Sequence, residues 1–294
     1  MRYRVTHITT YQYHEPVAVS NNLVHLAPRQ LPHQRVLEHS LQIAPEAVAL
    51  HEHTDWFGNR AGTFAIERPH RQLIVTSRAL IERSAPPAIE AGLTMAWERV
   101  AGAIGRVDPS LLDVVEFADE SPLVPALPAF ADYADDDFAP GRPILDTALA
   151  VMHRIYREFR YDSEATSVNT PVGEALARRH GVCQDFSLVL IGTLRARGLP
   201  ARYVSGYLET IPPPGKPRMV GADATHAWAQ VHVGDPSLGE DGWIDLDPTN
   251  DCIPGDSHLT VAYGRDFADV SPLKGMILGG GQAQVKVSVD VERQ

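Results

Sequence analysis

The segment at residues 181–186, GVCQDF, constrains the fold more than any other stretch, because it marks a turn that leads directly into a buried helix. A short helix that opens at Thr170 and Pro171 precedes it, with Gly181 as a left-handed stop. The apolar residues of the next helix recur at helical spacing: Phe186, Val189, Leu190 and Leu194. Cys183 is therefore predicted to lie at or near a helix N-terminus.

A cysteine in this position has two interpretations. Free backbone N–H groups and the helix dipole favour negative charge, which lowers a thiol pKa and increases the thiolate fraction. A lone cysteine is more often a small buried apolar residue, and Cys252 fits that description of a bystander thiol. The residues that follow Cys183 favour a nucleophile.

The charge of the chain limits its partners. The 294 residues carry a formal net charge of −11, whereas contacts to phosphate require a positive field, so nucleic acid is not an expected partner. No apolar run of the ~18 residues that a membrane helix needs occurs. The two cysteines cannot form a disulfide framework, and the opening MRYRVTHITT has no continuous apolar core, so we expect a cytoplasmic protein without a secretory signal. The sequence indicates no cofactor and no oligomeric state.

Three regions are predicted. Residues 1–84 have period-two patterns typical of a small antiparallel β-sandwich. Its expected strands are 2–13, 18–27, 35–43, a hairpin over 54–66 that turns at Gly58 and Asn59, and 72–82. Residues 85–143 contain many prolines and are expected to form a linker with irregular helices. Residues 144–294, which open with a helix over 144–159, are expected to form the catalytic core with C-terminal strands.

Three further strands are predicted after the Cys183 helix, at 201–208, 224–233 and 242–247. The last two are separated by turn-forming residues, so they are expected to pair as an antiparallel hairpin. Placing their alternating apolar residues toward one core forces the intervening residues to the opposite face. These residues are His226, Trp228, Gln230, Trp243, Asp245 and Asp247.

This face carries the groups that acyl transfer through a thiol needs. An imidazole, here His226, takes and returns the proton of the thiol, and a carboxylate holds the other ring nitrogen. Cross-strand spacing does not separate Asp245 from Asp247, although the latter precedes Pro248 at the strand end that lies beside the start of the His226 strand.

Three motifs together resemble the transglutaminase-like superfamily, which has a papain-like cysteine fold. They are GVCQDF at 181–186, GADATHAW at 221–228 and GWIDLDPTN at 242–250. The N-terminal strands resemble the β-rich region that precedes the core in a bacterial subfamily, and residues 258–275 resemble its tail. The resemblance implies an α+β protein in which the nucleophile, at a helix N-terminus, packs on an antiparallel sheet.

The resemblance also implies roles for individual residues. Cys183 is the nucleophile, His226 the general base and acid, and Asp247 the orienting carboxylate. Gln184, Trp228 and Asp245 are candidates for supporting roles. The tryptophan that animal transglutaminases place in the oxyanion hole has no counterpart just before Cys183, which leaves the backbone N–H of Cys183, with Gln184 as a candidate helper. No calcium loop is present, so calcium activation is not implied.

The leading hypothesis is an enzyme that attacks a carboxamide or peptide carbonyl and forms a thioester, which water or an amine then resolves. Its substrate would be a peptide, a protein or a small amide. One alternative is a non-catalytic peptide-binding module with the same fold, against which the intact Cys, His and Asp argue. Another is a metal site drawn from His180, Cys183, His226, Cys252 and His258, which lacks a close cysteine pair.

Overall fold

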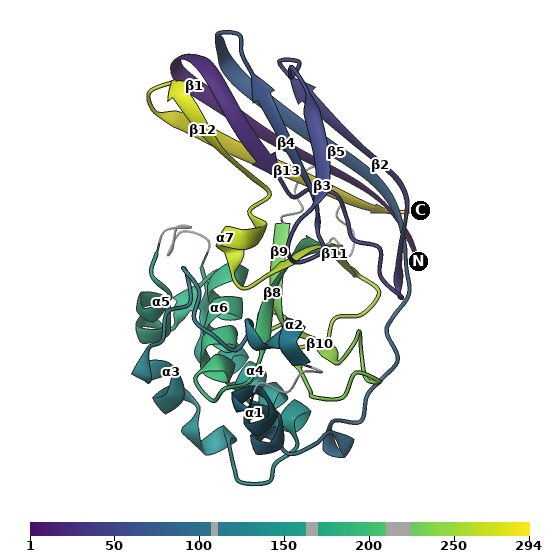
Figure 1. The fold of residues 1–294 in the computed structure, drawn as a ribbon, viewed down its shortest axis with the longest axis vertical. Helices are drawn as coiled ribbons and strands as arrows, with labels where there is room; N and C mark the ends of the chain where they lie inside the picture. Colours follow the sequence, from purple (N-terminus) through teal and green to yellow (C-terminus); the bar gives the residue numbers. More distant parts are fainter. Residues whose placement is uncertain (107–110, 163–169, 210–224) are drawn as a thin grey trace, which may run out of the picture.

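The computed structural model of the chain describes residues 1–106, 111–162, 170–209 and 225–294. These residues form a large antiparallel sheet, a smaller antiparallel sheet and a group of helices packed against the smaller sheet (Figure 1). This arrangement confirms the α+β class. None of the described helices is long and apolar enough to pass through a lipid bilayer.

The large sheet contains seven strands, and in its long strands β1 (Arg2–Val24) and β5 (His70–Arg83) buried residues recur between exposed ones, which gives each of the two an apolar face. The other strands are β2 (Gln34–Ala44), β3 (Leu50–Thr54), β4 (Arg60–Ile66), β12 (Leu273–Gly279) and β13 (Ala283–Arg293). The two strands predicted at 2–13 and 18–27 are thus one long strand, β1. Its first half pairs with β5 and β13, and its second half with β4 and β12.

The sheet bends where β1 passes from one set of partners to the other. The N–H of Glu15 donates to the Gly280 carbonyl at 3.1 Å, and the N–H of Gly280 donates to the Pro16 carbonyl at 3.2 Å. Three glycines with positive φ, Gly279 to Gly281, let the chain between β12 and β13 follow the same bend. Apolar side chains from both halves pack together inside: Tyr13, Val17, Val24, Leu26, Phe64, Ile66, Leu73, Val75 and Leu273.

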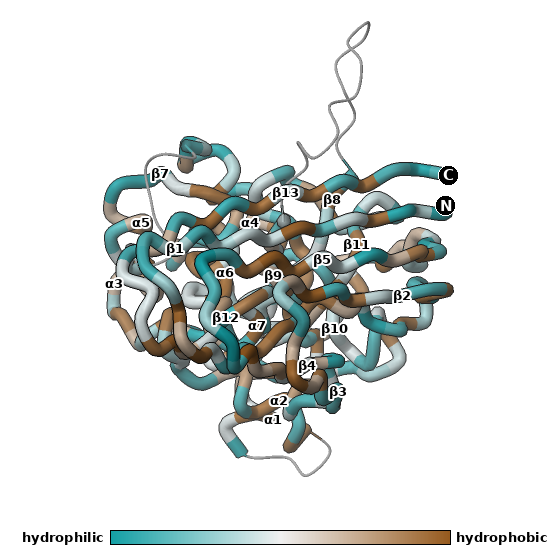
Figure 2. The backbone as a smooth tube through the Cα atoms, turned by 90° about the horizontal axis from the view of Figure 1, so that it is seen from above, coloured by the Kyte–Doolittle hydropathy of each residue, from teal (hydrophilic) through white to brown (hydrophobic). Residues whose placement is uncertain are grey.

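The last two strands lie in the large sheet, whereas the division from sequence grouped them with the catalytic core. Tyr3 of β1 pairs with Arg293 of β13, so the two ends of the chain lie side by side (Figure 2). The mostly exposed residues of β13 did not identify β1 as its partner strand. Two strands that pair from opposite ends of the sequence leave no local signal in either segment.

The smaller sheet has the strand order β10-β9-β8-β11. Its strands are β8 (Ala201–Leu208), β9 (Thr225–His232), β10 (Trp243–Leu246) and β11 (His258–Gly264), and β6 (Arg160–Tyr161) and β7 (His180–Gly181) form a separate parallel pair. The helices are η1 (Ala91–Leu93), α1 (Trp97–Gly105), α2 (Leu112–Val115), α3 (Pro128–Tyr133), η3 (Asp135–Asp137), α4 (Ile144–Glu158), α5 (Val172–Arg178), α6 (Cys183–Arg195) and α7 (Phe267–Val270). Of these, α6 packs against β9 and β8 of the smaller sheet.

Helix α6 lies at the centre of the main apolar core. Leu190, Ile191 and Leu194 of α6 are fully buried and share one cluster with Ala229 and Val231 of β9. The same cluster includes residues of the large sheet: Tyr3, Val5, Ala79, Ile81, Val289 and Val291. Segment 85–143 also contributes buried residues, among them Val100, Val124 and Phe130, so it packs on the core and does not merely connect two regions.

Two side-chain amides join the large sheet to the free edge of β11. The Gln34 amide bonds both backbone groups of Thr260, at 2.7 and 2.9 Å. The Asn59 amide does the same for Tyr263, at 2.7 and 2.8 Å. The two amides occupy the positions where a neighbouring strand would form hydrogen bonds. The backbone groups of Thr260 and Tyr263 at the edge of the smaller sheet are therefore hydrogen-bonded without a fifth strand.

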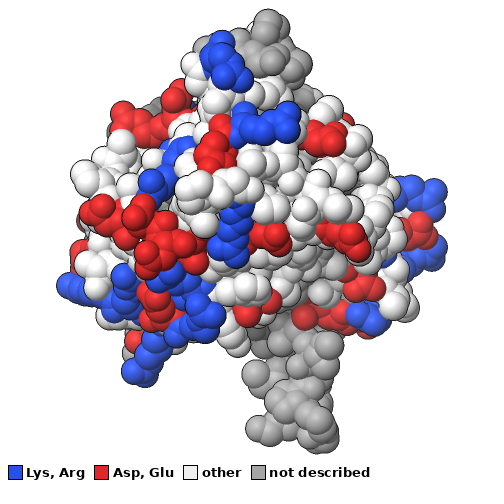
Figure 3. All heavy atoms as spheres, turned by 90° about the horizontal axis from the view of Figure 1, so that it is seen from below, with Lys and Arg blue, Asp and Glu red and all other residues white. Residues whose placement is uncertain are grey.

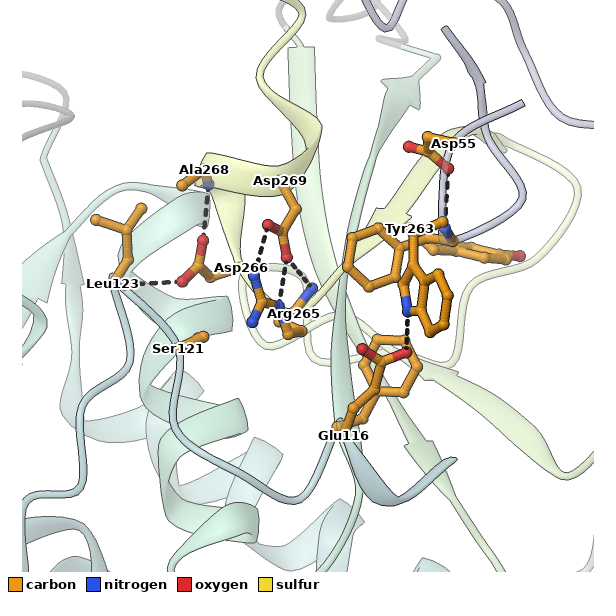
Figure 4. Close-up of polar contacts among 12 residues, drawn as sticks. Asp55, Glu116, Ser121, Leu123, Tyr263, Arg265, Asp266, Ala268 and Asp269 are labelled. Atoms are coloured by element: carbon orange, nitrogen blue, oxygen red, sulfur yellow. Dashed lines mark hydrogen bonds and ion pairs between the residues drawn. The ribbon is translucent and has the colours of Figure 1, made fainter. Parts of the chain in front are cut away.

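Carboxylates attach the irregular segments to this frame (Figure 4). Asp266 accepts the N–H of Leu123 and that of Ala268, each at 2.7 Å, and Arg265 forms an ion pair with Asp269 at 2.9 Å. On the face seen from below, basic and acidic side chains lie next to one another (Figure 3). The helices use such neighbours in ion pairs, of which Arg178 with Glu174 at 2.7 Å is one.

We predict that Asn59→Ala lowers the free energy of unfolding by about 2–4 kcal/mol, because Asn59 is fully buried and both backbone groups of Tyr263 lose their partner. Denaturant unfolding followed by circular dichroism measures this. Gln30→Ala is the matched control, since Gln30 is exposed and, among the described residues, its amide bonds only the backbone of Val36, and it should cost less than about 1 kcal/mol. Equal losses in the two variants would contradict the role of Asn59.

Candidate active site

Helix α6 begins at Cys183 after an extended residue, Val182. The Val182 N–H donates to the Asp185 carboxylate at 2.9 Å, which fixes the first turn. A Cβ on Gly181 would lie 2.4 Å from an Asp185 carboxylate oxygen, so only glycine fits there. Cys183 therefore occupies the first helical position, half-buried, with Gln184 half-buried beside it.

The helix before this turn ends earlier than the sequence predicted. Arg179 takes the left-handed conformation, with φ 57°, and its N–H donates to the Ala175 carbonyl at 2.9 Å. The Arg179 guanidinium lies 4.0 Å from the centre of the Tyr133 ring, and this contact fixes the position of the Arg179 side chain. The helix therefore ends at Arg179 and not at Gly181, where the sequence predicted its end.

His226 lies at the start of β9 and links the thiol to a carboxylate. Its Nε2 lies 2.8 Å from Oδ2 of Asp247, and the Cys183 side chain lies close enough to the ring to raise the pKa of His226. Because Asp247 occupies Nε2, Nδ1 is the ring nitrogen that remains for an interaction with the thiol. His226 is 9 % exposed and Asp247 fully buried, so water screens their interaction weakly.

This environment changes the protonation of both groups. Burial lowers the pKa of His226, but the hydrogen bonds and charges of Asp247 and Cys183 outweigh burial and raise that pKa to about 10. Burial raises the pKa of Asp247, and the opposing hydrogen bonds, first that of His226, leave it well below its usual range. The arrangement favours a carboxylate beside an imidazolium at neutral pH.

Asp247 accepts five hydrogen bonds in total. Oδ1 accepts the backbone N–H groups of Thr249 and Asn250, at 2.9 and 3.2 Å. Oδ2 accepts the Asn250 amide at 2.7 Å and lies 3.0 Å from Nε2 of His258, in addition to His226. The carboxylate is therefore held in one orientation and stays ionised although buried.

The register of the hairpin separates the two aspartates. Asp245 lies directly opposite Gln230, and its Oδ1 accepts the indole N–H of Trp228 at 2.6 Å. The Trp228 ring lies 6.0 Å from the His226 ring, centre to centre. Asp245 thus contacts the histidine only through Trp228, whereas Asp247 contacts it directly. Residues 221–224 of the motif that contains His226 lie outside the described residues.

Comparison with known proteins identifies the family. Residues 3–82 match the bacterial transglutaminase-like N-terminal region, and residues 132–248 match the transglutaminase-like superfamily. An uncharacterized protein of Mycobacterium tuberculosis is 41 % identical over 99 % of this chain and 92 % of its own length. The chain belongs to the transglutaminase-like superfamily.

Other relatives extend the comparison for this transglutaminase-like protein. An uncharacterized protein of Mycobacterium leprae is 30 % identical over 99 % of both chains. A protein-glutamine gamma-glutamyltransferase of Pseudomonas aeruginosa is 36 % identical over 26 % of this chain and 11 % of its own length. The structure of a candidate cysteine protease from Cytophaga hutchinsonii superposes with a TM-score of 0.74 at 20 % identity, covering 99 % of this chain and 90 % of that one.

Two residues of the site were not given these roles from the sequence. The sequence indicates His258 only as a candidate metal ligand and Asn250 only as part of a motif. No strand is predicted from the sequence at β11, so no predicted pairing could place His258 against Asp247. The position of Asn250 two residues after a strand-ending Asp-Pro was the available signal.

The structure brings together only some of the residues considered for a metal site. His226, Asp247 and His258 offer ligand atoms within 4.8 Å of one another, a set that suits a divalent metal. Hydrogen bonds to the shared carboxylate already account for the positions of both rings. His180 lies elsewhere, with its Nδ1 3.0 Å from the Arg178 carbonyl.

We predict that Cys183 reacts with iodoacetamide at neutral pH at least ~100 times faster than Cys252. Burial, Asp247 and Asp251 raise the pKa of Cys252 to about 11, whereas Cys183 lies beside an imidazolium at a helix start. Peptide mapping by mass spectrometry over time gives both rates. Cys252→Ser should leave the fast phase unchanged and Cys183→Ser should remove it; equal rates at the two thiols would refute the assignment.

A second prediction concerns the titration of His226. Asp247→Asn should lower its pKa from about 10 toward the usual value near 6.5, and Asp245→Asn should leave it near 10. Because the folded-state pKa is raised, the imidazolium stabilises the fold fully below about pH 6.5, and this stabilisation is lost as the pH rises through about 10. Nitrogen-15 NMR of the imidazole rings measures the titration. The same shift in both variants would show that Asp247 has no special role.

Proposed function

We propose that the protein is a cysteine-dependent acyl-transfer enzyme that acts on a carboxamide or peptide bond through a thioester at Cys183. The observation that carries the proposal is that the His226 ring joins the Cys183 thiol to the buried Asp247 carboxylate. These are the three groups, in the required order of contact, that thiol-based acyl transfer uses.

The proton movements follow from the positions of the ring nitrogens. In the resting pair Nδ1 of His226 already holds the thiol proton, and the thiolate sulfur bonds to the carbonyl carbon. When the C–N bond breaks, Nδ1 returns that proton to the leaving amine or ammonia, and the thioester remains. Water or an acceptor amine then attacks the carbonyl, gives its proton to Nδ1, and the thiolate leaves. Asp247 stays ionised throughout and stabilises the imidazolium in each half.

The start of α6 supports the other requirement, a place for the oxyanion. The N–H groups of the first helical residues have no partner within a helix, so those of Cys183 and Gln184 can donate to a developing negative charge. Gln184 is half-buried on the same turn, which suits a supporting role.

The choice between water and an amine as acceptor defines the activity. The names of the relatives support both outcomes, since one is a gamma-glutamyltransferase and another a candidate protease. We take a peptide or protein side-chain amide, or a small amide, as the substrate. Both cysteines are free thiols, which suits a reducing compartment, and we propose the cytoplasm.

Intact-protein mass spectrometry tests the proposal with a library of glutamine-containing peptides, and their glutamate counterparts serve as the matched control. We expect an adduct at Cys183 equal to the peptide minus ammonia, which disappears in Cys183→Ser. Asp247→Asn should slow its formation by about 10³–10⁴, as when the orienting aspartate of a serine triad is amidated, and Asp245→Asn by less than about tenfold. Addition of a primary amine separates transfer from hydrolysis by the mass of the released product.

Two results would contradict the proposal. Peptides that bind without any adduct would support the non-catalytic binding module. An adduct that forms equally fast in Asp247→Asn would remove the orienting role of that carboxylate while leaving Cys183 as the nucleophile.

A further inference from the structure

A cavity of about 310 Å³ lies along β10, the edge strand of the smaller sheet. Its lining comes from four separate stretches: 31–33, 83–89, 239–245 and 253–255. A volume of this size suits a small organic molecule. Because β10 leads directly to Asp247, the cavity lies beside the candidate active site and shares Asp245 with its surroundings, but Cys183, His226 and Asp247 do not line it.

The walls of the cavity are mainly apolar. Trp243 and Ile244 of β10, 6 % and 4 % exposed, form one side, and Pro86 and Ile89 cover it from the segment after β5. Ile253 lines the cavity while 44 % exposed, which places it at the rim. An apolar group that entered here would be removed from water on several sides.

A buried arginine lines the same cavity. Arg83, the last residue of β5, is 4 % exposed, and its Nε donates to the Gly255 carbonyl at 3.4 Å. Within residues 1–106, 111–162, 170–209 and 225–294 that carbonyl is the one hydrogen-bond partner of the guanidinium, so the terminal N–H groups are unpaired. The planar pair of terminal N–H groups of a guanidinium matches a carboxylate.

The acidic groups of the cavity differ in what they already bind. The Glu240 carboxylate accepts the Tyr263 hydroxyl at 3.0 Å. Asp245 is partly exposed, uses Oδ1 for the Trp228 indole and is attracted electrostatically to Arg83. The cavity therefore combines a cation with unpaired donors, a nearby carboxylate and apolar walls.

We propose that this cavity binds a small zwitterion with an apolar body, the chemistry of a free apolar α-amino acid. Arg83 binds the ligand carboxylate, Asp245 attracts the ammonium group, and the apolar side chain packs against Trp243, Ile89 and Ile253. A simple carboxylate would leave Asp245 facing a like charge, and a simple amine would leave Arg83 unpaired. The binding does not depend on the proposed enzyme activity.

The test uses the full chain with Cys183→Ala, so that no acyl chemistry takes place and failure of binding says nothing about catalysis. Isothermal titration and ligand-observed NMR compare L-leucine with 4-methylpentanoate, which lacks the ammonium group, and with 3-methylbutylamine, which lacks the carboxylate. We expect L-leucine to bind at least ~10-fold more tightly than either. No binding of L-leucine, or equal binding of all three, would overturn the proposal.

Two matched pairs of variants locate the site. Arg83→Gln should weaken L-leucine binding at least ~10-fold, whereas Arg35→Gln, at an arginine 68 % exposed and paired with Glu82, should not. Ile253→Glu should weaken it by a similar factor, because the apolar side chain of the ligand would remove water from the new charge, whereas Ile253→Gln, which is neutral, should change it less than ~3-fold. The second pair keeps the proposal testable if Arg83→Gln fails to fold. Unchanged binding in Ile253→Glu would place the ligand elsewhere and overturn it.

Discussion

The candidate site depends on one buried anion, the Asp247 carboxylate. A fully buried carboxylate is unstable unless hydrogen bonds replace its water, and here two backbone N–H groups and three side chains do so. His226 and His258 come from different strands, so β9, β10 and β11 must all be in place before the carboxylate is satisfied. The histidine that faces the thiol is thus oriented by the assembled sheet and not by its own strand alone.

The sequence predicted the parts of this arrangement that have a local signal. Alternation in β9 and β10 placed His226 and Asp247 on one face, and the turn before α6 placed Cys183 at a helix start. The link from Asp245 to Trp228 agrees with the same register. The alternation of side chains along a strand was enough to predict this face, because the apolar residues pack toward α6 and the residues between them must point away from it.

What the sequence did not indicate is long-range. The pairing of β12 and β13 with β1, the contact of His258 with Asp247 and the amide bonds of Gln34 and Asn59 to β11 all join residues whose local patterns are ordinary. The early helix end at Arg179 has a similar cause, since a cation–π contact with Tyr133 compensates for a conformation that a non-glycine residue rarely takes. In each case the partner that decides the outcome lies far away in the chain.

The pairing of β1 with β13 also has a consequence for how the molecule is made. The Arg293 side chain bonds the Tyr3 hydroxyl across 290 positions, so β1 gains this neighbour only after β13 has been synthesised. Until then β1 presents an unpaired edge, which is a site for aggregation. A chain released before β13 has been made would therefore keep this unpaired edge on β1, and the eleven residues of β13 are what cover it.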